Sequence, residues 1–400
     1  MSGRVRMSVV GVSLLVVAYV VGGGLLGRTA GEGAYKQLAV VSEVLSRIQS
    51  DYVEEPNLQR VTVGALHGLL AELDPYSGYM SPREYAEYQQ KLPLAEGRVG
   101  LVLSKRFWLA SVVAVLPGSP AARAGLQTGD LLESIAGFST REMSIDQSEQ
   151  LLAGEPGTTV KVAVVRQQRP EPETLELVRA RLAPPRVLSQ RLEGGAGYLK
   201  IAAFGPGTAG EARTALKQLH ASGSRQLALD LRDAASGSMA EAIETARLFL
   251  DKGLITYTQG QQSPRQQFTA EAGAQVWKEP VVVLINHATA GPGEVVAAAL
   301  QGNHRARVVG LRSYGVGSVQ KLIPLDDGAA LILTVAKYYN PGGKTLQENG
   351  VTPDVEAAPA EGQLLAPVPH APPRPDDAVL TKGLEVLRTQ AEAAPARQAA

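Results

Sequence analysis

Side chains that could carry nucleophilic or proton-transfer chemistry lie mainly in the second half of the chain. The hydroxyls, amines and acid–base groups concerned are Thr289, Ser313 and Ser318, then Lys321, Lys337 and Lys344, and finally Asp233, His287 and Glu294. A serine hydroxyl is a weak nucleophile until a neighbouring base takes its proton, and a lysine whose pKa is lowered by burial can serve as that base. An acid–base set built from these groups would be a hydrolase site, although lone histidines are more often structural or exposed.

Residue content excludes several other chemistries. The chain has no cysteine, so it has no disulfide framework, thiolate zinc site, cysteine nucleophile or lipidated N-terminal cysteine. The segment Gly291–Gly293 lacks the Lys-Ser/Thr that follows a phosphate-binding glycine loop. Lys and Arg together number 39, as do Asp and Glu, which leaves no basic field for a nucleic-acid partner. We therefore predict neither a cofactor nor a metal.

Buried-type strands alternate with helical segments from residue 197 to about residue 355. The predicted strands are 198–201, 227–231 and 280–285, and the predicted helices are 209–219 and 239–250. This alternation predicts an α/β layer with helices packed on a central sheet. In such folds, functional sites gather at strand ends and helix starts.

Residues 97–182 form a second region, in which short β-rich runs are separated by glycine and proline. The runs in order are VGLVL, LASVVAVL, DLLESIAG and TTVKVAVVR. The segment PGSPAARAGL follows the second run, and TGDLL then leads into the third. This order resembles a PDZ domain of the protease-associated kind. The resemblance implies that a protein or peptide C-terminus binds as an added strand, with its carboxylate held by the glycine loop. That loop falls on Val99, Gly100, Leu101, Val102 and Leu103.

The N-terminal segment predicts where the protein resides. Residues 7–27 carry no charge over 21 positions, and about 20 apolar residues cross a hydrocarbon core. Arg4 and Arg6 precede this segment, which favours a cytoplasmic N-terminus and an extracytoplasmic, periplasmic body. We predict a single membrane anchor, with a cleaved signal peptide as the alternative. Residues 38–90 then show helical spacing, which predicts a cap of two or three helices.

Six motifs in the C-terminal half occur in the order and spacing of a known peptidase family. They read GYLKIAAF, ALDLRDAASG, ARLFLDKGLI, VVVLINHATAGPGEVVAAALQ, VVGLRSYGVGSVQKLIPLDDGAALILTVAKYY and NGVTPDV. With the helical cap and the PDZ-like module, they resemble the carboxy-terminal processing peptidases, the S41 serine peptidases, over about residues 38–355. The resemblance implies a multidomain α/β protein with a helical cap (35–95), a PDZ domain (96–184) and a peptidase-like α/β core (185–358). From the sequence itself we predict a membrane anchor and joint before them (1–34) and an Ala/Pro-rich tail after them (359–400), with a possible last helix over 376–390.

Active members of this family use a serine nucleophile at a helix start and a lysine base. The nucleophile segment, T-A-S-A-S-E in the family, corresponds to TAGPGE, so Gly291 occupies the nucleophile position. The base segment, F-G-K-G-S-V-Q, corresponds to YGVGSVQ, so Val316 occupies the base position and Gln320 keeps the supporting glutamine. The oxyanion loop, L-R-N-N-P-G-G in the family, reads LRDAASG and keeps only Gly237 of its glycine pair. Glycine and valine exchange no protons, so the resemblance implies a vacant proteolytic site.

Three functions stay open on the sequence. The vacant site favours a pseudoprotease that binds protein C-termini through its PDZ domain, or that regulates a partner such as an active peptidase or an envelope protein. One alternative is an active serine endopeptidase that trims C-terminal regions through non-standard residues. The other is a structural scaffold with a vestigial PDZ domain.

Overall fold

The computed structural model describes residues 38–90, 96–106, 108–141, 143–166, 169–182, 187–359 and 376–397. It divides into two compact units, residues 1–66 and 67–400. The described part of the first unit is a helix over residues 38–51 and most of helix α2 (Leu58–Ala71). None of the helices in these ranges is both long and apolar enough to cross a membrane. The anchor predicted at residues 7–27 lies outside the described residues.

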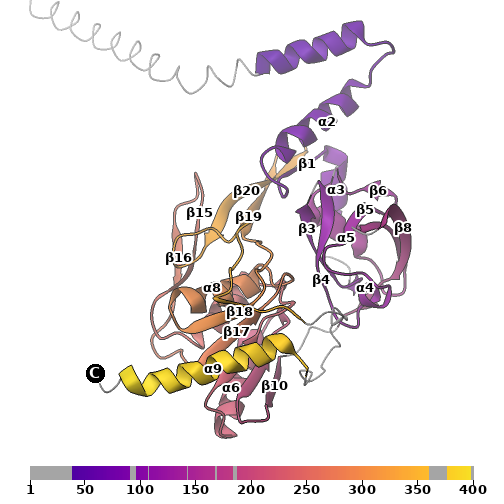
Figure 1. Ribbon diagram of the computed structural model, residues 1–400. Helices are drawn as coiled ribbons and strands as arrows, with labels where there is room; N and C mark the ends of the chain where they lie inside the picture. Colours follow the sequence, from indigo (N-terminus) through magenta and orange to yellow (C-terminus); the bar gives the residue numbers. More distant parts are fainter. Residues whose placement is uncertain are drawn as a thin grey trace, which may run out of the picture. The chain divides into compact units, whose positions relative to one another are not determined.

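A six-stranded sheet forms the centre of the α/β core (Figure 1). Its strands, in spatial order, are β10 (Leu188–Arg191), β11 (Gly197–Lys200), β13 (Leu227–Asp230), β17 (Val281–Ile285), β18 (Ala306–Gly310) and β21 (Val355–Glu356). β10 runs antiparallel to β11, and all the other neighbours are parallel. The three strands predicted from the sequence are β11, β13 and β17, each shifted by no more than one residue at either end.

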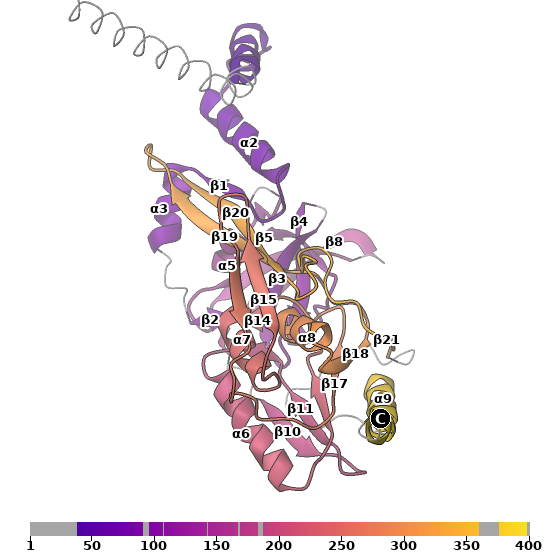
Figure 2. The same ribbon diagram turned by 90° about the vertical axis from the view of Figure 1, so that its left-hand side faces the viewer.

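Helices cover both faces of this sheet. The helices α6 (Thr208–Ala221), α7 (Met239–Arg247) and α8 (Pro292–Gly302) pack on one face, and α9 (Ala378–Arg397) packs on the other. Figure 2 shows α6 and α9 on opposite sides of the strands. Successive residues of a strand point to opposite faces, so Leu227 and Leu229 join the core beneath α6 to α8, whereas Ala228 packs beneath α9. The last helix predicted at residues 376–390 is confirmed as α9.

A second sheet of five strands includes one strand from the cap, where only helices were predicted. Its order is β1 (Gly78–Met80), β20 (Ala330–Tyr339), β15 (Leu254–Gln259) and β16 (Gln266–Thr269), with β19 (Ser318–Pro324) also paired to β20. The turn that precedes β1 explains this strand. The Asp74 carboxylate accepts hydrogen bonds from the backbone N–H groups of Tyr76 and Ser77, and the Ser77 hydroxyl accepts one from Thr334 N on β20. The cap continues from β1 into helix α3 (Pro82–Gln90).

The β-rich module is a separate antiparallel sheet with two short helices. Its strands, in spatial order, are β3 (Leu101–Arg106), β4 (Leu109–Val115), β5 (Leu131–Ile135), β7 (Thr159–Arg166) and β8 (Arg169–Val178), with β6 (Phe138–Ser139) paired to β5. The helices are α4 (Pro120–Arg123) and α5 (Ile145–Leu152), and the pair β2 (Gly97–Arg98) and β9 (Ala180–Arg181) joins the two ends of the module. β3 is an edge strand, which pairs only with β4 among the strands of the described part.

Candidate functional site

The two positions that the motifs assign to nucleophile and base meet at one buried carboxylate. Glu294 lies in the first turn of α8, and its Oε2 accepts hydrogen bonds from Gly291 N at 2.8 Å and from Val316 N at 2.8 Å. Its Oε1 accepts from Gly315 N at 2.7 Å and from the Ser313 hydroxyl. Two segments that are far apart in the sequence are therefore joined by a single side chain.

Burial dominates the electrostatics of this carboxylate. Glu294 has no exposed surface, and desolvation raises its pKa to about 7. Hydrogen bonds from Ser313, Val316 N, Gly291 N and Gly315 N act in the opposite direction and limit the rise in the pKa. No ion pair to Glu294 is present among the described residues. Its negative charge is therefore stabilised by N–H and O–H donors alone.

Gly291 keeps an unusual backbone conformation at the start of α8. Its φ is 50° and its ψ is −109°, a region that side-chain-bearing residues rarely adopt. A Cβ atom at this position would meet only Met239 Cε, at 3.6 Å, which is an ordinary contact. The position thus has room for a side chain but carries none. Neither Gly291 nor Val316 can accept or donate a proton through a side chain.

Sequence reasoning missed a further departure from the family pattern beside Gly291. Pro292 follows the nucleophile position and begins α8. Proline has no N–H group, whereas the N–H of the residue after a nucleophile is a frequent donor to the oxyanion of the transition state. The signal was present in the sequence, since the family pattern has alanine at this place.

Gly237, the glycine retained in the oxyanion loop, is required by the backbone around it. It lies in β14 (Ser236–Gly237), which pairs with β12 (Ala203–Phe204). Its φ is 114°, and a Cβ atom would lie 2.2 Å from Phe204 O. Upstream in the same loop, Asp233 and Asn286 are joined by reciprocal hydrogen bonds of 3.0 and 2.9 Å. The loop therefore has a defined structure without its second glycine.

Gln320 lies on β19, and its side chain forms no hydrogen bond with Gly291, Val316 or Glu294. Its Nε2 donates to Ser318 Oγ at 2.7 Å and to Thr334 Oγ1 at 3.3 Å, and the side chain is exposed. The glutamine that bonds the segment around Val316 is Gln347, which is buried and accepts a hydrogen bond from Gly317 N at 2.9 Å. Sequence reasoning missed Gln347, because only the fold brings it to this segment.

The other hydroxyls near the site are occupied by structural hydrogen bonds. Ser313 donates to Glu294 and accepts from Val351 N at 2.6 Å. Thr289 donates to Leu231 O at 2.8 Å and accepts from Asn286 N at 3.0 Å. His287 is exposed and bonds the backbone carbonyl of Arg312 at 2.8 Å. Thr289 and His287 thus have no base partner among these contacts. Ser313 does donate to a carboxylate, but both groups are buried, so this hydroxyl is not open to a substrate. No group of three metal-ligating side chains occurs within the described ranges.

The predicted peptide loop leads directly into the edge strand β3. Val99 is buried and its carbonyl accepts a hydrogen bond from Ala121 N. Gly100 has a φ of 84°, and a Cβ there would lie 2.1 Å from Ser119 Cβ, so only glycine fits. Along β3 the side chains alternate: Leu103 lies in the core of the module, with Leu101 packed against that core, whereas Val102 faces the vacant site.

Val102 belongs to a small apolar cluster that joins the β-rich module to the vacant site. The cluster contains Val113 and Ala114 from β4, together with Ala235, Ala288 and Ala290, and Tyr314 and Val316 pack against it. The face of β3 and β4 that lies outside the core of the module is thus packed on the residues around positions 291 and 316.

Comparison with known proteins places the chain in a family. Residues 195–357 match the model of peptidase family S41, and residues 111–166 match the model of a PDZ domain. A carboxy-terminal-processing protease of Bartonella bacilliformis is 32% identical over 329 residues, which cover 81% of this chain and 76% of that protein. The chain belongs to peptidase family S41. Another relative, a carboxyl-terminal-processing protease of Synechocystis, is 33% identical over 315 residues, which cover 77% of this chain and 74% of that protein.

The S41 fold is also found in a solved structure. The photosystem II D1 C-terminal processing protease superposes with a TM-score of 0.66 at 26% identity, over 79% of this chain and 92% of that chain. The multidomain α/β fold with a PDZ module and an S41 core is thereby confirmed. Within this S41 member, the positions of the nucleophile and base motifs are those that meet at Glu294.

Proposed function

We propose that this chain is a proteolytically inactive S41 protein that acts by binding protein C-termini. One observation carries the proposal: the backbone N–H groups of Gly291 and Val316 donate to the same Glu294 oxygen, so the two motif positions lie together, but neither bears a reactive side chain. Loss of the nucleophile removes covalent catalysis, and the absence of an N–H on Pro292 removes one donor to a developing oxyanion.

The binding activity is assigned to the edge of β3. This strand leaves one edge unpaired within the described part, and the glycine loop precedes it. A peptide can extend such a sheet by adding a strand, and backbone N–H groups of the loop can hold its terminal carboxylate. The partner is accordingly a protein with a free C-terminus, such as an envelope protein or an active peptidase that the chain regulates.

The proposed location is the extracytoplasmic side of a membrane, with the body periplasmic. The support is the uncharged stretch of residues 7–27, preceded by Arg4 and Arg6. Removal of residues 1–34 should convert a protein that resists carbonate extraction from membranes into one that is released. Release of the intact chain by carbonate would contradict the anchor.

A direct assay of catalysis tests the inactive state. The purified full chain should show no labelling by a fluorophosphonate and no cleavage of an unfolded casein substrate. The carboxy-terminal-processing protease of Bartonella bacilliformis, assayed in parallel, is the positive control. Turnover that co-purifies with the chain and disappears on mutation of Ser313 or Ser318 would overturn the proposal and support the alternative of an active endopeptidase with non-standard residues.

A further inference from the structure

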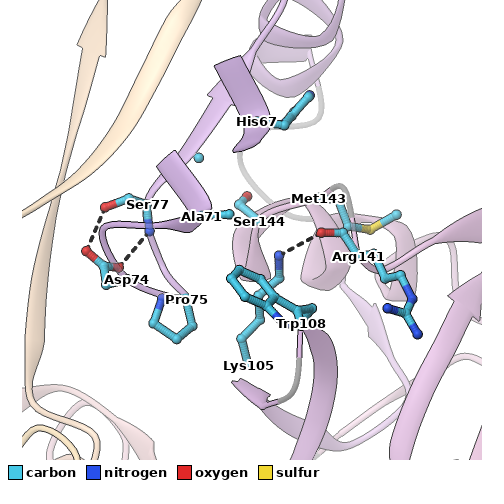
Figure 3. Close-up of a pocket in the computed structure, with 11 residues that line it drawn as sticks. His67, Ala71, Asp74, Pro75, Ser77, Lys105, Trp108, Arg141, Met143 and Ser144 are labelled. Atoms are coloured by element: carbon cyan, nitrogen blue, oxygen red, sulfur yellow. Dashed lines mark hydrogen bonds between the residues drawn. The ribbon is translucent and has the colours of Figure 1, made fainter. Parts of the chain in front are cut away.

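A cavity of about 240 Å³ opens at the far end of β3 from the glycine loop. It lies between the turn after α2 and the loops that flank β3 and α5, and its wall includes Pro75, Ser77, Lys105, Trp108, Arg141 and Met143 (Figure 3). We call this cavity the Lys105 pocket. No residue of the vacant proteolytic site lines it, so it is a separate feature of the PDZ module and the cap.

Lys105 brings a positive charge into this pocket without an acidic partner. Its ammonium donates to the backbone carbonyl of Arg141 at 3.2 Å, and no salt bridge to Lys105 or Arg141 is present in the described part of the chain. Desolvation lowers the pKa of Lys105. A partly buried ammonium with donors to spare favours an anionic ligand.

The one carboxylate in the pocket wall does not neutralise this charge. Asp74 accepts hydrogen bonds from Tyr76 N, Ser77 N, the Ser77 hydroxyl and the Thr334 hydroxyl, each at 2.8 to 3.1 Å. Figure 3 shows its side chain turned towards Ser77 and away from Lys105. Asp74 is therefore committed to the turn that leads into β1.

Trp108 forms an apolar part of the wall in an uncommon backbone conformation. Its φ is 68° and its side chain is 51% exposed. A non-glycine residue with positive φ costs free energy, and such residues are concentrated at functional sites. The exposed ring beside Lys105 offers a surface for the methylene groups of a ligand side chain.

The position of Lys105 along β3 matches the register of a bound peptide. Lys105 is four residues after Leu101, a distance of roughly 14 Å along a strand at about 3.4 Å per residue. A peptide whose carboxylate sits at the loop must run antiparallel to β3 to add to its edge. The fourth residue before the peptide's last residue then lies beside Lys105. Because strand side chains alternate with period two, that residue points to the same face as Leu101, Leu103 and Lys105.

We propose that the Lys105 pocket is a specificity subsite that binds an acidic side chain four residues before the C-terminus of the protein held at β3. This inference rests on the proposed function, because it requires the PDZ edge to bind free C-termini. It adds a recognition element: the glycine loop reads the terminal carboxylate and the Lys105 pocket reads a second negative charge upstream.

Binding of matched peptides to the full chain in detergent tests the subsite. The probe is a fluorescent decapeptide with an apolar C-terminal residue and glutamate four residues before it. The control peptides carry glutamine there, or glutamate one residue nearer the end. We expect the matched glutamate peptide to bind about tenfold more tightly than the glutamine peptide, as one charge-assisted hydrogen bond would produce. The displaced glutamate should give no gain.

The variant Lys105→Met removes the charge and keeps the apolar stem. It should abolish the preference for glutamate and leave the affinity for the glutamine peptide unchanged, which also shows that the groove is folded. Lys161→Met is the matched control, because Lys161 lies on β7, pairs with Glu176 and does not line the pocket. This control should keep the tenfold preference.

Two different failures are distinguishable. If the glutamate and glutamine peptides bind equally tightly and both lose affinity on C-terminal amidation, the groove binds C-termini and only the subsite is wrong. If no peptide binds, or amidation has no effect, the proposed function fails together with the subsite.

Discussion

Glu294 is the residue on which the geometry of the vacant site depends. The Glu294 carboxylate links the start of α8 to the segment before β19. Its oxygens accept hydrogen bonds from Gly291 N in the first segment and from Gly315 N and Val316 N in the second. A buried charge of this kind is tolerated only when hydrogen bonds replace its hydration. The two motif segments are therefore held together by hydrogen bonds although neither Gly291 nor Val316 carries a reactive side chain.

The pH dependence of stability should reveal the state of Glu294. Its pKa in the folded chain, about 7, lies above the ordinary value of 4.5 for a glutamate, so the folded state binds more protons between these pH values. Its contribution to the free energy of unfolding is then greatest below pH 4.5 and falls as the pH rises to about 7. When the pH rises from 4.5 to 7.5, the free energy of unfolding of the unmodified chain should fall by up to about 3 kcal/mol more than that of the Glu294→Gln variant.

Urea unfolding at the two pH values measures this difference. Glu294→Gln should be the less stable protein at pH 7.5, because an amide nitrogen cannot accept from the N–H groups of Gly291 or Val316. An identical change of the urea midpoint with pH in both proteins would mean that Glu294 does not titrate in this range.

Under the proposed inactive state, Gly291, Pro292 and Val316 differ in their expected consequences. Gly291→Ser with Val316→Lys would restore the two reactive groups. A Cβ atom at position 291 meets only an ordinary contact, although the positive φ there strains any residue with a side chain. Pro292 would still withhold one oxyanion donor, a loss worth about 10²- to 10³-fold in kcat. The triple variant that also carries Pro292→Ala should therefore react with a fluorophosphonate at least tenfold faster than the double variant. Equal rates would show that Pro292 is irrelevant to the site.

At the scale of the elements, helix α9 is tied to the sheet by an ionic network. Arg232 Nη2 donates to Asp230 Oδ2 at 2.6 Å and to Asp377 Oδ2 at 2.7 Å, and Tyr198 donates to Asp230 at 2.7 Å. Burial alone would raise the pKa of Asp230, but the charge of Arg232 lowers it below its usual value. Asp377 also accepts from Leu380 N at 3.0 Å at the start of α9.

Two substitutions at Asp377 separate its two contributions. Asp377→Ala removes both the ion pair and the cap of α9 and should cost about 2 to 4 kcal/mol, whereas Asp377→Asn keeps an acceptor for the cap and should cost less. Hydrogen exchange of residues 378–389 should accelerate most in Asp377→Ala. Equal protection of α9 in both variants and in the unmodified chain would show that packing alone holds the helix.

At the scale of the whole molecule, the PDZ module and the S41 core share the cluster around Val102. One face of β3 and β4 packs on the residues beside Gly291 and Val316, while one edge of β3 stays unpaired among the strands that the structure describes. The edge strand β3 and the segments around positions 291 and 316 are thus joined by direct packing. A change in one can reach the other without an intermediate element.

A charge placed in this cluster should weaken the packing between the two modules. Val113 is completely buried, and Val113→Asp would bury a carboxylate without a partner, at a cost of at least about 2 kcal/mol. We expect a lower thermal midpoint and faster hydrogen exchange in residues 288–291. Val178→Asp, on the half-exposed end of β8, is the control and should change neither. Unchanged exchange in Val113→Asp would show that the cluster does not couple the modules.

The family and the order of its modules follow from the sequence, because motifs are local in the chain. The strands β11, β13 and β17 and the helix α9 were also predictable, since burial imposes a regular pattern on each. Gly291 and Val316 could be assigned from their flanking residues alone, and the proline beside Gly291 was readable in the same way although it was overlooked.

Only the tertiary structure decided which residues form hydrogen bonds with the segments around positions 291 and 316. Glu294 joins Gly291 to Val316, Gln347 rather than Gln320 bonds the segment after Val316, and β1 leaves the cap to pair with β20. The Lys105 pocket likewise combines a turn of the cap with two loops of the PDZ module. Each of these contacts joins residues that are distant in the chain, and pairing over such distances depends on packing and register, which no local pattern encodes.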